Sequence, residues 1–184
     1  MTVKKPRLYL IKGGKDDLRI GTLQVTVAPP EALPFVVDAI VIEEDTWLIL
    51  STAPEVSAPS EHPLRILTSL LSAEPELPGR VVVREGAPLI LLAIVYDVGH
   101  ELVCRTEWVE DAYAEVFGIT GKRGIRSLSL PLLGIRHGRI PVARAVDLLV
   151  TAIGKGLSPQ LERLWIMVPK ELETEVMGII RNVG

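Results

Sequence analysis

The sequence predicts an α/β protein of three layers, with helices on both faces of a mixed central sheet. Apolar strand-like segments alternate with amphipathic segments through the second half of the chain, which is the pattern of parallel strands connected by helices. In the first half, short apolar segments are separated by glycine or proline turns, which indicates hairpins and antiparallel pairing. No change in composition marks a second domain. We therefore expect one domain over residues 1–184, with a hairpin extension over 1–34 and a core over 35–184.

The first half is expected to contribute four strands and one helix. Runs of apolar and β-branched residues predict the strands, and a proline-rich loop with a serine cap predicts the helix. The expected strands are 8–11, with a glycine turn at Gly13 and Gly14 after it, 18–27, 35–42 and 47–50. The helix is expected to follow Ser60 and to bury Leu64, Leu67, Leu70 and Leu71, with His62 in its first turn.

Three carboxylates lie between the last two of these strands, at Glu43, Glu44 and Asp45. Such a cluster could hold a metal or act in acid–base chemistry. Adjacent acids in a surface turn are usually solvated, however. We therefore expect a solvated acidic turn and no metal site.

The second half is expected to alternate strands and helices. The run 89–96 is entirely apolar, so we expect it at the centre of the sheet. Asp97 and His100 follow its carboxyl end, where ligands of open α/β sheets gather. The other expected elements are strands over 80–85 and 164–168, a helix capped by Thr106 and ended by Gly118, and a final helix over 172–180.

Composition excludes several classes of protein. A formal net charge of −3 argues against a general nucleic-acid binder, which normally carries a basic surplus. The longest apolar run is too short to cross a membrane, and the polar start of the chain does not resemble a signal peptide. The single cysteine, Cys104, excludes an intrachain disulfide and fits a reducing compartment. We expect a cytoplasmic protein, and its 48% hydrophobic content is compatible with a homodimer.

The segment 124–153 carries the strongest functional pattern. Leucines alternate with serines over 127–132 as in a strand, and Gly134 and Gly138 bracket a short basic loop. Pro141 then stands where a first helical residue is expected, before an apolar stripe with helical spacing. Free amides at a helix start favour a phosphate, and Arg136 and Arg139 add positive charge. An ordinary βα turn with solvated arginines explains the same spacing.

Two local matches resemble the macro domain, a three-layered α/β/α family that typically binds ADP-ribose. Residues 37–41, VDAIV, look like a strand of that family. Residues 124–131, GIRSLSLP, with the glycine loop after them, are similar to its strand and pyrophosphate-binding loop. The resemblance implies a macro-domain-like sheet and places the candidate ligand-binding residues at Asp38, Gly134, Ile135, Arg136, His137 and Gly138.

The sequence departs from this family at two of its motifs. An asparagine motif follows VDAIV in the family, whereas residues 42–45 here are IEED, so only Asp45 could replace the last asparagine. The family's triple-glycine loop is replaced over 51–63 by a stretch without glycine. In addition, Ile135 and Arg136 stand where the family tends to have threonine and glycine. Because both lost motifs support hydrolysis in relatives, we expect a binding module rather than an enzyme.

Three functions therefore remain open. The first is a divergent module that binds ADP-ribose or a related phosphate-containing nucleotide at residues 134–138, without a cofactor, through backbone amides, the helix dipole and Arg136. The second is a hydrolase of ADP-ribosyl or phosphoester bonds, for which Asp45, Asp97 and His137 are the candidate bases. The third is a scaffold that has lost its pocket and acts through assembly.

Overall fold

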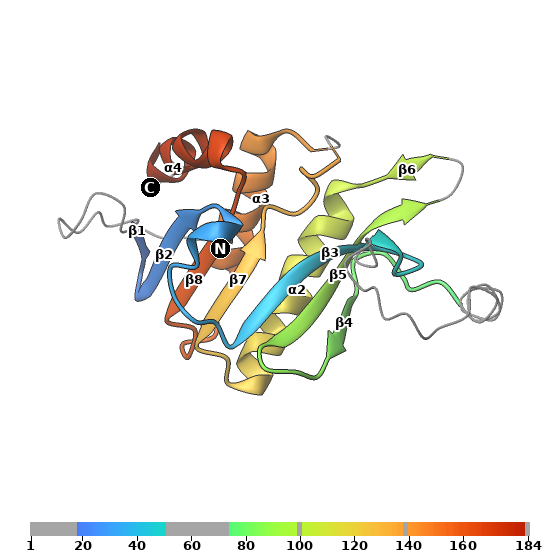
Figure 1. Ribbon diagram of the computed structural model, residues 1–184, viewed down its shortest axis with the longest axis horizontal. Helices are drawn as coiled ribbons and strands as arrows, with labels where there is room; N and C mark the ends of the chain where they lie inside the picture. The colour runs from blue at the N-terminus through green and yellow to red at the C-terminus, as the bar shows by residue number, and fades with distance from the viewer. Residues whose placement is uncertain (1–17, 51–73, 99–100, 138–139, 183–184) are drawn as a thin grey trace, which may run out of the picture.

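The computed structural model describes residues 18–50, 74–98, 101–137 and 140–182 (Figure 1). The strands are β1 (Leu18–Ile20), β2 (Leu23–Ala28), β3 (Ala39–Asp45), β4 (Val81–Arg84), β5 (Leu89–Val98), β6 (Leu102–Val103), β7 (Ser127–Pro131) and β8 (Arg163–Met167). The helices are α2 (Thr106–Arg123), α3 (Val142–Lys155) and α4 (Glu173–Asn182), with short 3-10 helices η1 (Pro30–Ala32) and η3 (Lys170–Leu172).

The chain folds as a mixed sheet flanked by helices, which confirms the predicted three-layer α/β/α class. The sheet order is β1-β2-β8-β7-β3-β5-β4, and β6 pairs with the end of β5. Neighbours from β2 to β5 in this order are parallel, whereas β1 pairs antiparallel with β2 and β4 with β5. The carboxyl ends of β2, β8, β7 and β3 therefore meet at one edge, where residues that follow these strands gather.

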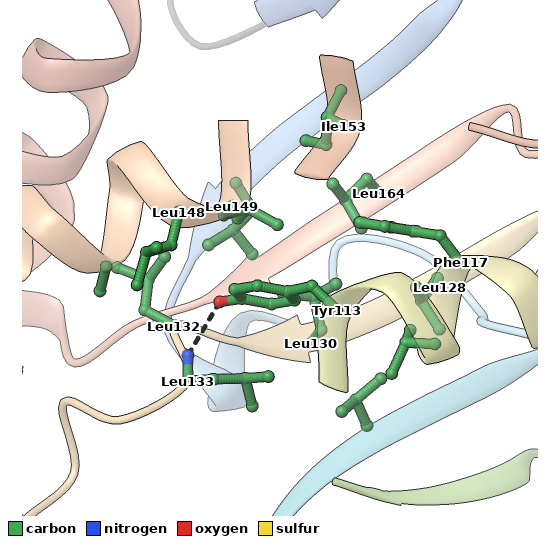
Figure 2. Close-up of a cluster of buried hydrophobic side chains, with 14 of the residues drawn as sticks. Tyr113, Phe117, Leu128, Leu130, Leu132, Leu133, Leu148, Leu149, Ile153 and Leu164 are labelled. Atoms are coloured by element: carbon green, nitrogen blue, oxygen red, sulfur yellow. Dashed lines mark hydrogen bonds between the residues drawn. The ribbon is translucent and has the colours of Figure 1, made fainter. Parts of the chain in front are cut away.

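Helix α2 lies behind the sheet in the view of Figure 1 and packs on β5 and β4. Helix α3 contacts both α2 and α4. At the centre of this packing Tyr113 is fully buried, and its hydroxyl accepts a hydrogen bond of 2.9 Å from the backbone N–H of Leu133 (Figure 2). Burial raises the pKa of the Tyr113 hydroxyl, so it stays protonated. This bond fixes the peptide that enters the loop between β7 and α3.

Two elements of the first half differ from the prediction. Residues 18–27 do not form one strand, because the chain turns at Gly21, with a φ of 63°, and β1 folds back on β2. Residues 47–50 are not a strand either. Asp45 explains why: its carboxylate accepts backbone hydrogen bonds from Trp47, Ile49 and Leu50 at 2.7 to 2.9 Å and winds the chain into a turn.

The predicted solvated acidic turn is also wrong. Glu43, Glu44 and Asp45 form the last residues of β3, and all three side chains are buried. No glycine, proline or asparagine interrupts the chain between Ile40 and Asp45, so the strand continues to its partner β5. The strand therefore runs over 39–45 rather than 35–42.

The second half follows the prediction more closely. Strand β5 lies beside β4 near one end of the sheet order rather than at its centre. Helix α2 continues through Gly118, next to which a side chain would meet open space, and ends at Gly124 in the left-handed conformation. Arg105 is its N-cap, so Thr106 is the first helical residue rather than the cap. Similarly, Pro141 is the N-cap of α3 rather than its first residue.

Several predictions concern residues outside those described. They are the strand over 8–11, the turn at Gly13 and Gly14, the helix after Ser60 with His62, and the positions of His100, Gly138 and Arg139. Among the helices that are described, none combines the length and apolar character needed to cross a membrane.

We predict that Asp45→Ala destabilises the protein by about 2 kcal/mol, because three backbone N–H groups lose their acceptor. Urea unfolding followed by circular dichroism measures this change. The control is Asp147→Ala on the exposed face of α3, which breaks only a surface ion pair with Arg144 and should change stability by less than about 0.5 kcal/mol. Equal effects of the two substitutions would contradict the capping role of Asp45.

Candidate functional site

A cavity of about 850 Å³ opens at the edge where the carboxyl ends of the parallel strands meet. Its walls come from the ends of β7 and β8, from Glu43 on β3, from η1 and η3, and from the start of α3. Ligands in open α/β sheets bind at such an edge, and a cavity of this volume holds a nucleotide-sized molecule. The cavity thus lies beside the segment 124–153, which carries the strongest functional pattern in the sequence.

One wall of the cavity is apolar. It is formed by the ends of the strands, by residues in and beside η1 and η3, and by the start of α3. These residues are Pro30, Pro131, Leu132, Ile140, Pro141, Val142, Met167, Val168, Pro169 and Leu172. Surfaces of this composition suit a flat, weakly polar ring.

Charged groups complete the lining. Arg136 and Lys170 are exposed cations that line the cavity. Glu31 and Glu171 are exposed acids on the same lining, whereas Glu43 is buried. The cavity therefore offers cations to an anionic ligand but also carries an internal carboxylate.

Gly134 begins the loop between β7 and α3 in the left-handed conformation, with a φ of 87°. A Cβ atom there would lie 2.7 Å from Cδ1 of Ile140 and 3.3 Å from Sγ of Cys104. The loop folds back on itself, because the backbone N–H of Ile140 donates to the carbonyl of Gly134 at 3.1 Å. Glycine is required here both by its conformation and by the lack of space.

Glu43 lies under this loop and lines the cavity, although the sequence analysis expected it in a solvated acidic turn. Only 4% of its surface is exposed, and the backbone N–H of Gly134 donates to its Oε1. The Tyr96 hydroxyl donates to the same oxygen at 3.5 Å. Burial raises the pKa of Glu43 to about 7, against the opposing effects of the Gly134 hydrogen bond and the charge of Arg136. The carboxyl group therefore titrates close to neutral pH.

The hydrogen bonds of the loop amides limit where a phosphate could bind. Leu133 donates to Tyr113, and Gly134 donates to Glu43, so these two amides already have acceptors. The first backbone N–H groups of α3, from Val142 onward, have no carbonyl acceptor within the helix and point outward from its start. An anion is therefore best accommodated between Arg136 and the start of α3.

Most of the predicted loop residues lie at or beside the cavity. Ile135 and Arg136 line it, and Gly134 shapes the loop that borders it. His137 is exposed, and its ring meets the ring of Tyr96 edge-on with 5.0 Å between their centroids. Gly138 falls outside the described residues.

The structure does not bring the three predicted aspartates to the cavity lining. Asp38 precedes β3 at the opposite edge of the sheet, where its carboxylate accepts hydrogen bonds from the backbone of Arg126 and Ser127 at 2.9 and 2.8 Å. Burial acts to raise the pKa of Asp38, but the hydrogen bonds with the side chain of Ser127 and with the backbone of Arg126 and Ser127 leave it below its usual value. Asp45 caps the turn after β3, and Asp97 accepts a hydrogen bond from Thr46 at 3.2 Å. In the described ranges no cluster of His, Cys, Asp and Glu could hold a metal.

Comparison with solved structures identifies the fold as that of a macrodomain. The Oceanobacillus iheyensis macrodomain solved with ADP is similar with a TM-score of 0.63 and 12% identity, over 91% of this chain and 93% of that chain. The Trypanosoma brucei macrodomain in complex with ADP-ribose gives 0.60 and 16% identity, over 87% and 69%. The macrodomain of Thermus aquaticus DarG gives 0.58 and 18% identity, over 79% and 98%. No family model and no curated protein matches the sequence.

We predict that Gly134→Ala destabilises the protein by about 1–3 kcal/mol, because the new methyl group meets Ile140 and the φ angle is unfavourable for alanine. Gly118→Ala is the matched control, since it lies inside α2 with open space around it and should stabilise by up to about 1 kcal/mol. Thermal unfolding of both variants measures the difference. A neutral Gly134→Ala would contradict the described loop conformation.

We predict that the stability of the protein falls as pH rises, because the folded protein raises the pKa of Glu43 from 4.5 to about 7. The folded state binds the proton more tightly than the unfolded state, so the free energy of unfolding decreases across this window. Between about pH 5 and about pH 8 the loss from this group is roughly 2–3 kcal/mol. Urea unfolding at both pH values measures it.

Glu43→Gln keeps the shape of the side chain without its charge and should remove this part of the pH dependence. Glu171→Gln is the control, because Glu171 lines the same cavity but is exposed, and it should retain the wild-type dependence. If wild type and Glu43→Gln lose the same stability on alkalinisation, Glu43 is not the group responsible.

Proposed function

We propose that this protein binds a nucleotide-type ligand with the general structure of ADP-ribose in the cavity at the carboxyl edge of its sheet. The observation that carries this proposal is the position of the cavity, which joins an apolar wall to Arg136 and the start of α3. In the macrodomains of similar fold described above, ADP and ADP-ribose are the molecules named with the solved structures. The sequence identity to these macrodomains is low. The details of ligand binding are therefore inferred from the residues that line the cavity of this protein.

The lining suggests how such a ligand would be oriented. A base would lie against the apolar wall near Met167, Pro169 and Leu172. The diphosphate would lie between the Arg136 guanidinium and the outward-facing amides at the start of α3. Lys170 is also on the lining and would add to the positive potential.

Binding without hydrolysis is the favoured activity. Of the candidate bases from the sequence, Asp45 is occupied by three backbone N–H groups and Asp97 binds the hydroxyl of Thr46. His137 is exposed beside Tyr96 and is not on the cavity lining. The single cysteine further supports a reducing compartment such as the cytoplasm.

We predict that isothermal titration calorimetry detects binding of ADP-ribose by the wild-type protein. Arg136→Ala should weaken it by at least about tenfold, because a charge-assisted contact to phosphate is lost. Arg84→Ala is the matched control, since Arg84 ends β4 at the far end of the sheet order and should change affinity by less than about twofold. Heats equal to those of buffer for ADP-ribose and ADP would reject the ligand class.

A further inference from the structure

Glu43 lines the cavity and at the same time binds a backbone amide of the loop beside it. Its side chain lines the cavity, and its Oε1 accepts the hydrogen bond from the N–H of Gly134. The Tyr96 hydroxyl donates to that same oxygen, so in the described part of the chain both hydrogen bonds of the carboxyl group are made by Oε1. The Gly134 amide is therefore held by an anion that belongs to the protein itself.

This arrangement acts against a ligand phosphate at the same point. A backbone amide makes one strong hydrogen bond, so a phosphate would have to displace the carboxylate or lie within a few ångströms of it. Two anions at that separation repel each other, and the repulsion is stronger away from bulk water. Arg136 reduces the repulsion, because its positive charge also acts on Glu43.

A ligand hydroxyl group at this point would be attracted by the carboxylate, whereas a phosphate would be repelled. A carboxylate only accepts hydrogen bonds, and a sugar hydroxyl can donate one to it. The hydroxyls of Tyr96 and Tyr113 also interact with Glu43, and burial keeps both protonated and uncharged. The surroundings of the carboxylate thus accommodate a neutral donor better than a second anion.

We propose that Glu43 is a specificity-determining residue of the cavity, which withholds the Gly134 amide from ligand phosphate and favours a ligand that brings a hydroxyl group to this point. This inference rests on the proposed function, since it concerns how the same cavity selects among nucleotide-type ligands. It assigns the sugar of such a ligand to the neighbourhood of Glu43 and the diphosphate to Arg136 and the start of α3.

The test compares the affinities for ADP-ribose and for adenosine, which has the sugar hydroxyls but no phosphate. Calorimetry is carried out at about pH 8, where Glu43 is charged, on wild type, Glu43→Gln and Glu43→Ala. Both ligands lose the hydroxyl contact to the carboxylate, but only ADP-ribose is relieved of the repulsion on its phosphates, so removing the charge should raise the ratio of the ADP-ribose affinity to the adenosine affinity by about tenfold. Glu171→Gln removes an exposed charge from the same cavity and should raise ADP-ribose affinity by less than about threefold.

The outcomes separate this inference from the function on which it rests. If wild type binds ADP-ribose and the ratio of the ADP-ribose affinity to the adenosine affinity is the same in wild type and both Glu43 variants, the inference is overturned and the proposed function stands. An equal gain in Glu171→Gln would also overturn it, because any lost negative charge would then suffice. Binding of ADP-ribose to wild type that is strengthened relative to adenosine in both Glu43 variants, but not in Glu171→Gln, would support it. Absence of binding to every protein would overturn the proposed function and the inference together.

Discussion

The hydrogen bond between the Gly134 amide and the buried carboxyl group of Glu43 is the interaction on which the site depends. It joins β3 to the loop after β7, two segments that lie about half the chain apart in sequence. Burying a carboxylate is costly unless donors and opposite charge surround it. Here the Gly134 amide and the Tyr96 hydroxyl are the donors, and Arg136 supplies the opposite charge. These contacts offset burial only in part, so the pKa of Glu43 is still raised to about 7. The loop conformation and the charge of the cavity are therefore coupled.

The rest of the structure supports this contact from below. Tyr113 on α2 holds the peptide of Leu133, which fixes the direction in which the chain leaves β7. Ile140 fills the space beside Gly134 that a side chain would otherwise occupy. With the loop held from two sides, α3 starts beside the cavity and directs its first amides outward. The loop geometry and the groups proposed to contact the phosphate and the sugar of a ligand consequently belong to one packed unit at the carboxyl edge of the sheet.

The sequence was most informative over residues 124–153, where the pattern is local. The alternation in β7 and the helical spacing of Val142, Val146 and Leu149 predict strand, loop and helix within two residues of their observed ends. By contrast, the turn after β3 depends on a carboxylate that binds backbone groups up to five residues ahead, which hydrophobic periodicity does not reveal. The hydrogen-bond partner of Glu43 lies 91 residues away in the sequence, so a local pattern does not reveal it. The two acids that follow Glu43 suggested instead that its side chain is solvated. The absence of glycine, proline and asparagine between Ile40 and Asp45 was the available indication that the strand continues through the acids.

The most direct test of this account is the pH titration of the Gly134 amide by NMR spectroscopy. If Glu43 holds this amide, its ¹H and ¹⁵N shifts should titrate with a midpoint at about pH 7 and become pH-independent in Glu43→Gln. A Gly134 amide whose shifts do not change between about pH 5 and about pH 9, or change identically in Glu43→Gln, would contradict the contact and with it the description of the site.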